Sequence, residues 1–234
     1  DPYDITPYRG GYAIVDAVSD AQLLEIGEAA AGHALITGGS GIAIGLPENF
    51  RRAGTLPLRD DPGALPRPEG HAAVLAGSCS RATLFQIATA RAQVPTLELD
   101  TLATPDAAAL AAQAKDWMQG KLGTAPVVIA ASAPPDKVAA LQARLGRDAA
   151  GLLIETALAE IADALVAAGV RRLVVAGGET SGAVVKRLGV RRLRIGAEID
   201  PGVPWTFAER DGGVLLLALK SGNFGAPDFF LKSF

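Results

Sequence analysis

Three glycine-rich turns constrain the fold of this chain more than any other feature. They have the sequences Gly-Ser-Cys-Ser at residues 77–80, Gly-Gly-Glu-Thr-Ser-Gly at 177–182 and Lys-Ser-Gly-Asn-Phe-Gly at 220–225. The first two lie between an apolar segment and a helical segment. At such a junction glycine lets the backbone approach a ligand, and the N–H groups at the start of the helix bind an anion. The repetition of this arrangement predicts a phosphate site, and most simply a nucleotide site.

Short apolar segments alternate with helical segments between residues 72 and 188. Runs of four to six apolar residues between helices are typical of buried strands in a parallel sheet that is covered on both faces. We therefore expect an α/β fold with a mostly parallel, Rossmann-like sheet and helices on both faces. The expected strands are 72–76, 96–99, 127–131 and 173–176, and the expected helices are 81–92, 105–122, 135–145, 149–168 and 181–188.

The C-terminal segments follow a different pattern. Residues 193–196, 203–207 and 214–219 are expected to form successive strands separated by glycine or proline turns. The sequence Asp-Gly-Gly at 211–213 is typical of the turn of a hairpin. We therefore expect antiparallel strands near the C-terminus of the sheet.

A proline-rich segment at residues 57–70 divides the chain. It contains four prolines and two glycines, a density that is typical of a linker. The predicted domains are therefore residues 1–56 and residues 71–234. In the first domain we expect strands at 12–17 and 34–37, a helix at 21–31 capped by Asp20, and a short helix at 46–54.

Composition excludes several classes of protein. The formal net charge is −3, without a basic face, which argues against nucleic acid as the main partner. Cys79 is the only cysteine, and His33 and His71 stand alone, so neither a disulfide framework nor a metal site is predicted. No apolar run reaches the ~20 residues that span a bilayer. These features predict a cytoplasmic protein without a membrane partner.

The second turn offers the most chemistry. Gly177 and Gly178 permit positive φ angles and close contact with a ligand. Thr180 and Ser181 are expected to cap the following helix and to bind phosphate oxygens. Glu179 repels phosphate unless a metal lies between them or the side chain points toward a ribose. The alternative is an ordinary tight turn, since neither the P-loop nor the dinucleotide fingerprint is matched.

The first and third turns carry further candidates. Ser78 and Ser80 offer hydroxyl groups to a phosphate or a ribose, although serine also caps many helices without binding anything. Gly222 and Gly225 allow a bent loop after the last strand. Lys220 either neutralises a phosphate or faces water at the end of that strand.

Around these turns the chain resembles the four-carbon acid sugar kinase family, which includes 3-oxo-tetronate, D-threonate and D-erythronate kinases. The resemblance spans nearly the whole chain, and the motifs keep the family's order. The matching stretches are TGGSGIAIGL at 37–46, AGSCSRATLFQI at 76–87, VVAGGETSGAVV at 174–185 and LKSGNFGAPDFF at 219–230.

The resemblance implies a kinase in which the C-terminal half binds ATP with Mg²⁺ and faces an N-terminal domain that binds a small sugar acid. It assigns no catalytic residue and no protein ligand for a metal. A homodimer is a further expectation. The resemblance implies ATP contacts at Ser80, Gly177, Gly178, Glu179, Thr180 and Gly222, with Ser78, Ser181 and Gly225 as additional candidates. A fourth glycine loop, at Gly39, Ser40 and Gly41, is expected to contact the substrate.

One family motif is missing from this sequence. The acidic Asp-Asp-x-Thr-Gly motif of the family's N-terminal domain is not found. The resemblance therefore implies that residues 1–56 are the C-terminal remnant of the sugar-acid domain. It also implies that the chain is truncated and, although it binds nucleotide, inactive alone.

Two other hypotheses stay open at this point. The first is a non-enzymatic interaction domain of the effector type. The second is an NAD-type nucleotide-binding domain, in which Asp100, about twenty residues after Gly77, would bind the ribose.

Overall fold

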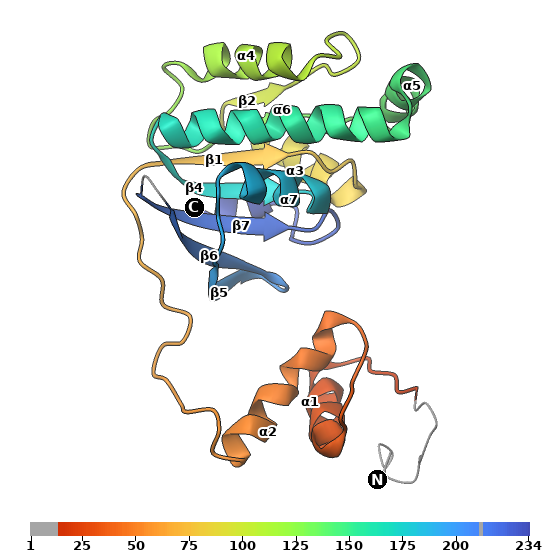
Figure 1. Cartoon of the computed structure of the whole chain (residues 1–234), viewed down its shortest axis with the longest axis vertical. Coiled ribbons are helices and arrows are strands. Elements are labelled where there is room, and N and C mark those ends of the chain that lie inside the picture. Colours follow the sequence, from red (N-terminus) through yellow and green to blue (C-terminus); the bar gives the residue numbers. More distant parts are fainter. Residues whose placement is uncertain (1–13, 211–212) are drawn as a thin grey trace. The chain divides into compact units, whose positions relative to one another are not determined.

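The computed structural model describes residues 14–210 and 213–234. The chain divides into two compact units, residues 1–62 and residues 63–234, which Figure 1 shows as ribbons. The division falls between Pro62 and Gly63, inside the proline-rich segment.

The described part of the first unit is helical. A pair of glycines lets its helices meet, because a methyl group on Gly27 or on Gly45 would collide with the backbone of the other. The side-chain amide of Asn49 donates a hydrogen bond to the carbonyl of Gly27 at 2.7 Å. The elements are α1 (Asp20–Ala29), η1 (Ala30–Gly32), η2 (Ser40–Ile44) and α2 (Leu46–Arg52).

Three predictions for this unit are wrong. Residues 34–37 do not form a strand, and neither do residues 14–17 of the strand expected at 12–17; residues 12 and 13 lie outside the described residues. A strand needs a hydrogen-bonded neighbour, and the described residues of this unit contain no strand to pair with. The cap of α1 is Ser19 rather than Asp20, since the Ser19 hydroxyl accepts a hydrogen bond from the N–H of Gln22.

The described residues of the second unit form a seven-stranded sheet with the order β2-β3-β1-β4-β7-β6-β5. The five strands from β2 to β7 in this order are parallel, whereas β6 and β5 are antiparallel. This confirms the predicted mixed α/β sheet. The bounds are β1 (His71–Ala76), β2 (Thr96–Glu98), β3 (Val127–Ala130), β4 (Val170–Ala176), β5 (Arg194–Asp200), β6 (Val203–Arg210) and β7 (Gly213–Lys220).

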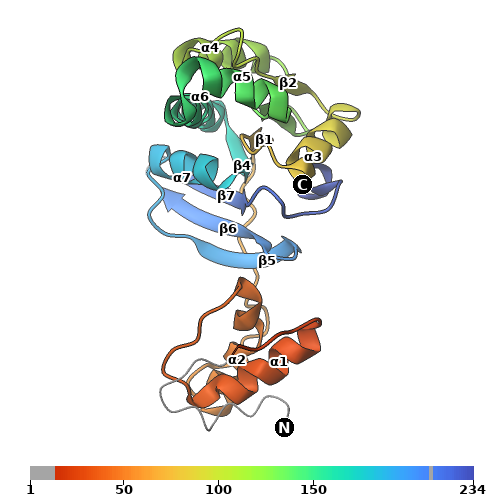
Figure 2. The ribbon, with the colours of Figure 1, turned by 90° about the vertical axis from the view of Figure 1, so that its right-hand side faces the viewer.

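Helices cover both faces of the sheet (Figures 1 and 2). Successive side chains of β1 point to opposite faces: Leu75 packs with α4 (Ala107–Met118), α6 (Arg147–Ala167) and α7 (Gly178–Arg187). Val74 packs with α3 (Arg81–Arg91) and α8 (Phe229–Lys232). A further helix, α5 (Pro135–Leu145), is joined to α6 through Gly146. None of the described helices combines the length and the apolar character needed to cross a membrane.

Two local features differ from the sequence prediction. Helix α7 begins at Gly178, three residues earlier than expected, so Thr180 and Ser181 lie in its first turn and the capping position is Gly177. Glycine has no side chain, so this position forms no side-chain cap hydrogen bond. The short helix α8 was not predicted. The expected hairpin pairs Arg210 with Gly213, and the other two turn residues, Asp211 and Gly212, lie outside the described residues.

Candidate functional site

The register of the sheet brings the three glycine-rich turns to one edge. Ala76 of β1 pairs with Ala176 of β4, which pairs in turn with Lys220 of β7. Each turn therefore leaves the sheet at the same level. The connection after β1 runs through α3 on one face, and the connection after β4 runs through α7 on the other. Ligands of open parallel sheets bind at such a point, outside the carboxyl ends of the strands.

The first two turns are in direct contact. The N–H groups of Gly77 and Ser78 both donate to the carbonyl of Ala176, at 2.9 and 3.1 Å. Gly177 has φ +131°, and a side chain on it would lie 2.9 Å from the Thr180 hydroxyl. A methyl group on Gly77 would collide with the same hydroxyl. Both glycines are therefore required by the packing of the two turns.

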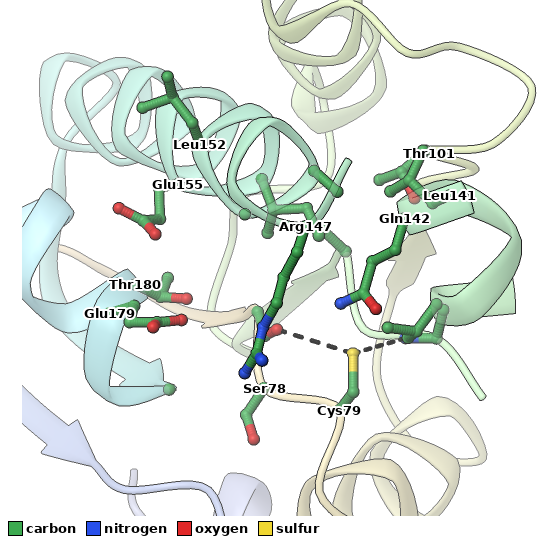
Figure 3. Close-up of a pocket in the computed structure, with 18 of the residues that line it drawn as sticks. Ser78, Cys79, Thr101, Leu141, Gln142, Arg147, Leu152, Glu155, Glu179 and Thr180 are labelled. Carbon is green, nitrogen blue, oxygen red and sulfur yellow. Dashed lines mark hydrogen bonds between the residues drawn. The ribbon is translucent and has the colours of Figure 1, made fainter. Parts of the chain in front are cut away.

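A cavity of about 670 Å³ opens beside these turns. One wall consists of turn residues after β1, β3 and β4, and the other consists of α5 and α6 (Figure 3). This volume lies within the range of ~300–1,000 Å³ that is usual for small-molecule sites. Five of the predicted binding residues line the cavity, namely Ser78, Gly177, Gly178, Glu179 and Thr180.

The start of α7 carries N–H groups without an acceptor in the helix, at residues that line this cavity. The first backbone hydrogen bond of the helix is the one that the Ser181 N–H donates to the carbonyl of Gly177, at 2.8 Å. The N–H groups of Gly178, Glu179 and Thr180 precede it, so they have no acceptor within the helix. A side chain on Gly178 would meet no atom within 4 Å. The backbone is therefore open to a ligand at this residue.

Four predicted binding residues do not line the cavity. The Ser181 hydroxyl is buried and donates to the carbonyl of Val175 at 3.5 Å. The Ser80 hydroxyl accepts from the N–H of Thr83 at 3.2 Å and so caps α3. Gly222 lies against Ser78, because a methyl group on it would collide with the Ser78 hydroxyl. Gly225 has φ +84° and lies against Phe229.

Side-chain hydrogen bonds hold the third turn in place. The Ser80 hydroxyl donates to the carbonyl of Gly222 at 2.5 Å. The amide nitrogen of Gln86 donates to the carbonyls of residues 224, 225 and 226 at 3.0–3.1 Å. Asp200 accepts hydrogen bonds from the N–H of Ala226 at 2.7 Å and from Lys232 at 2.5 Å. These bonds fix the turn beside Ser78.

Lys220 belongs to this packed arrangement. Its side chain is fully buried, so it does not face water, and it is not among the residues that line the cavity. The ammonium group donates to the Thr83 hydroxyl and to the carbonyls of Ser221 and Gly222 at 2.9–3.1 Å. Burial lowers the pKa of Lys220 to about 8. The lysine therefore stabilises the turn at 221–222 through these hydrogen bonds and lies outside the cavity lining.

The wall formed by α5 and α6 was not identified from the sequence. It contributes the apolar side chains of Val138, Leu141 and Ile154. Gln142 and Arg147 point from this wall into the cavity (Figure 3). These residues lie in helices without a glycine motif, so no local pattern marks them. The only sequence signal for this wall is Arg147 at the first position of α6, where the helix dipole disfavours a positive charge.

The remaining candidates lie elsewhere. Gly39, Ser40 and Gly41 belong to the first unit, at the start of η2, and all but the half-buried Gly41 are exposed. The carboxylate of Asp100 accepts hydrogen bonds from the N–H groups of Leu102 and Ala103 at 3.1 and 3.0 Å, outside the cavity lining. The NAD-type hypothesis thus gains no support from this carboxylate.

Comparison with known protein families identifies the second unit. A family described as the nucleotide-binding C-terminal domain matches residues 73–230. This range contains the whole cavity and the three turns.

Curated relatives are similar over nearly all of this chain. The 3-oxo-tetronate kinase of Burkholderia multivorans is 56% identical over 221 residues, which cover 94% of this chain and 51% of that protein. The 3-oxo-tetronate kinase of Cupriavidus necator is 57% identical over 219 residues, covering 93% of this chain and 50% of that protein. This chain therefore spans about half the length of these relatives.

Solved structures share the fold. A Salmonella typhimurium protein superposes with a TM-score of 0.76 at 35% identity, covering 93% of this chain and 51% of that one. Haemophilus influenzae protein HI1011 gives a TM-score of 0.71 at 36% identity, with coverage of 95% and 52%. The α/β architecture described above is therefore the one found in these crystal structures.

Proposed function

Because this chain belongs to the four-carbon acid sugar kinase family and carries its nucleotide-binding C-terminal domain, we propose that it is the ATP-binding part of a kinase for a four-carbon sugar acid. The relatives at 50–57% identity are named 3-oxo-tetronate kinases, which makes 3-oxo-tetronate the first substrate to test. The single observation that carries the proposal is the row of N–H groups at Gly178, Glu179 and Thr180, which have no acceptor within α7 and belong to residues that line a cavity of nucleotide size.

The phosphates bind at the glycine turns. The start of α7 combines unpaired N–H groups with the positive end of the helix dipole, and this combination favours an anion. Gly178 leaves room for phosphate oxygens next to the backbone. Ser78 and Thr180 also line the cavity, and their hydroxyl groups are further candidate donors.

The base lies against the wall formed by α5 and α6. Val138, Leu141 and Ile154 offer apolar contacts, and the side-chain amide of Gln142 can both donate and accept hydrogen bonds at the edge of a base. An apolar pocket with a few polar groups is typical of sites that bind flat organic rings. The nucleotide thus spans the cavity from this wall to the turns.

Mg²⁺ fits the same cavity through the phosphates. The described residues contain no group of three histidine, cysteine or carboxylate side chains placed to bind a metal. Mg²⁺ commonly needs only one or two carboxylates besides phosphate oxygens and water, and Glu179 provides one in the lining. The ion would neutralise charge on the transferred phosphoryl group. The carboxylate of Glu179 would then be a ligand that orients the ion.

The first unit belongs to the sugar-acid side of the enzyme in this proposal. The matched family begins at residue 73, and the relatives contain about as much sequence again. We therefore expect transfer to the sugar acid to require the part of the relatives that this chain does not span.

Titration with ATP and Mg²⁺ by calorimetry tests the proposal. Gly178→Val should weaken ATP binding by roughly 100-fold or more, because the side chain fills space that the phosphates need. Gly182→Val is the matched control, since Gly182 lies one turn further along α7 and also has no atom within 4 Å of an added methyl group. It should bind ATP like the wild type.

Two outcomes would contradict the proposal. One is a wild-type chain that binds no adenine nucleotide at millimolar concentration. The other is equal ATP affinity in the Gly178→Val and Gly182→Val variants. The requirement for further protein is tested separately with 3-oxo-tetronate as acceptor, and phosphorylation by this chain alone would contradict it. Cytoplasmic location and a homodimer stay predictions, for cell fractionation and sedimentation to test.

A further inference from the structure

Arg147 is a cation that extends into the cavity. It is the first residue of α6 and follows Gly146, which separates α5 from α6. Its side chain extends from the helix wall toward Ser78 and the first glycine turn (Figure 3). The guanidinium group therefore lies between the wall and the turns.

This guanidinium group has no protein partner among the described residues, whereas other arginines of the same unit do. Arg144 donates to the carbonyl of Leu102 at 3.0 Å, and Arg187 pairs with Asp163 at 3.2 Å. Three carboxylates also line the cavity, namely Asp148, Glu155 and Glu179, yet none of them forms an ion pair with Arg147 within the described part of the chain.

Helix stability does not explain an arginine at this position. A positive charge at the N-terminus of a helix is unfavourable, because the unpaired N–H groups there carry partial positive charge. Arg147 occupies this position in α6, a helix of 21 residues. An anion bound in the cavity removes the conflict, since it attracts both the arginine and the helix end.

The other cations near the turns are less suited to bind an anion in the cavity. Lys220 is buried and donates to Thr83 and to two carbonyls of its own turn. Lys137 also lines the cavity, but it lies close enough to Asp100 to help lower the pKa of that carboxyl, an effect due mainly to the N–H of Ala103. Of the two cations in the lining, Arg147 is thus the one without a neighbouring carboxylate, among the described residues, whose pKa it affects.

We propose that Arg147 binds the phosphates of the nucleotide from the α6 side of the cavity, opposite the glycine turns. The inference rests on the proposed function and adds a residue outside the sequence motifs. The planar guanidinium group donates two parallel hydrogen bonds to phosphate oxygens, a geometry that lysine cannot reproduce. The phosphates are then held by backbone N–H groups on one side and by an arginine on the other.

The test compares Arg147→Gln and Arg147→Lys with the control Arg187→Gln. Arg187 is the last residue of α7, outside the cavity lining. Calorimetry gives the affinity for ATP, and displacement of a fluorescent ADP analogue gives the affinity for inorganic tripolyphosphate. Arg147→Gln should weaken both by about 10- to 100-fold, and Arg147→Lys should weaken both by less. The control should leave both unchanged.

The thermal midpoint separates binding from folding. Arg147→Gln should leave it unchanged or raise it, because a cation is removed from a helix N-terminus. An Arg147→Gln chain that binds ATP normally would overturn the inference and leave the proposed function intact. A loss of ATP affinity without a matching loss for tripolyphosphate would also overturn it, since Arg147 would then contact the base or the ribose. A wild type without nucleotide binding would overturn both.

Discussion

The two sides of the site differ in how their polar groups are satisfied. On the packed side, defined by Ser80, Thr83, Gln86, Lys220 and the turn at 221–226, side-chain donors bind carbonyl oxygens of the chain. On the open side, defined by Gly178, Gln142 and Arg147, the polar groups face a cavity. The packed side therefore serves the fold, and the open side is where we expect a ligand to bind.

The adjacent residues Gly177 and Gly178 show the same difference on the smallest scale. Gly177 is buried, has φ +131° and has the Thr180 hydroxyl and the Ser78 N–H within 3.2 Å of an added Cβ atom. Gly178 is exposed and has open space around it. Gly177 is thus required by the packing of the protein itself, whereas Gly178 leaves space that the proposed ligand would occupy.

The largest expected effect on stability comes from adding a methyl group to a glycine on the packed side, Gly77, and comparing it with the same change at Gly178 on the open side. Gly77→Ala should lower the free energy of unfolding by about 1–3 kcal/mol, because the methyl group collides with Thr180 and crowds Leu158. Gly178→Ala should raise it by about 0.4–1 kcal/mol, since alanine reduces the freedom of the unfolded chain and meets nothing in the folded one. Urea denaturation measures both values. Equal changes in the free energy of unfolding of the two variants would contradict the distinction between the packed and the open side.

A smaller effect concerns Lys220 on the packed side. Burial lowers its pKa from 10.5 to about 8. Between these values the unfolded chain binds more protons than the folded one, so the free energy of unfolding should rise as the pH increases from about 8 to 10.5. Below this range the lysine is charged in both states, and the destabilising effect of burying the charge is fully present.

Lys220→Met isolates this contribution. The variant keeps an unbranched side chain but has no titrating group, so the rise in stability with pH should be smaller than in the wild type. The two unfolding profiles are compared point by point between pH 7 and pH 10.5, a range chosen from the two pKa values. Identical profiles would show that Lys220 does not titrate as a buried group.

The sequence predicted the second unit well because its strands are continuous apolar runs. His71–Ala76 and Val127–Ala130 are buried on both faces, and such runs have few alternatives to a covered parallel sheet. In the first unit the same reasoning failed at residues 34–37. An apolar run becomes a strand only when a neighbouring strand is available, and that depends on tertiary structure.

The site could be predicted only in part. The motifs located the turn that begins at Gly177, because two consecutive glycines directly after an apolar run can be recognised in the sequence. They did not show that the Ser181 hydroxyl is buried in the protein or that Gly225 packs against Phe229. Nor did they show that Arg147 points into the cavity. Those orientations depend on where α7 starts and on how α5 and α6 pack, so they follow from contacts between segments far apart in the sequence.

Alkylation of Cys79 tests the central claim most directly. Cys79 is the only cysteine of the chain and lines the cavity beside Ser78, with its sulfur accepting a hydrogen bond from the Ala133 N–H at 3.4 Å. A nucleotide bound between the turns and the α5–α6 wall would cover it. The account predicts that saturating ATP slows the alkylation of Cys79, measured by mass spectrometry, and that Gly178→Val abolishes this protection. An alkylation rate that saturating ATP leaves unchanged would contradict the account.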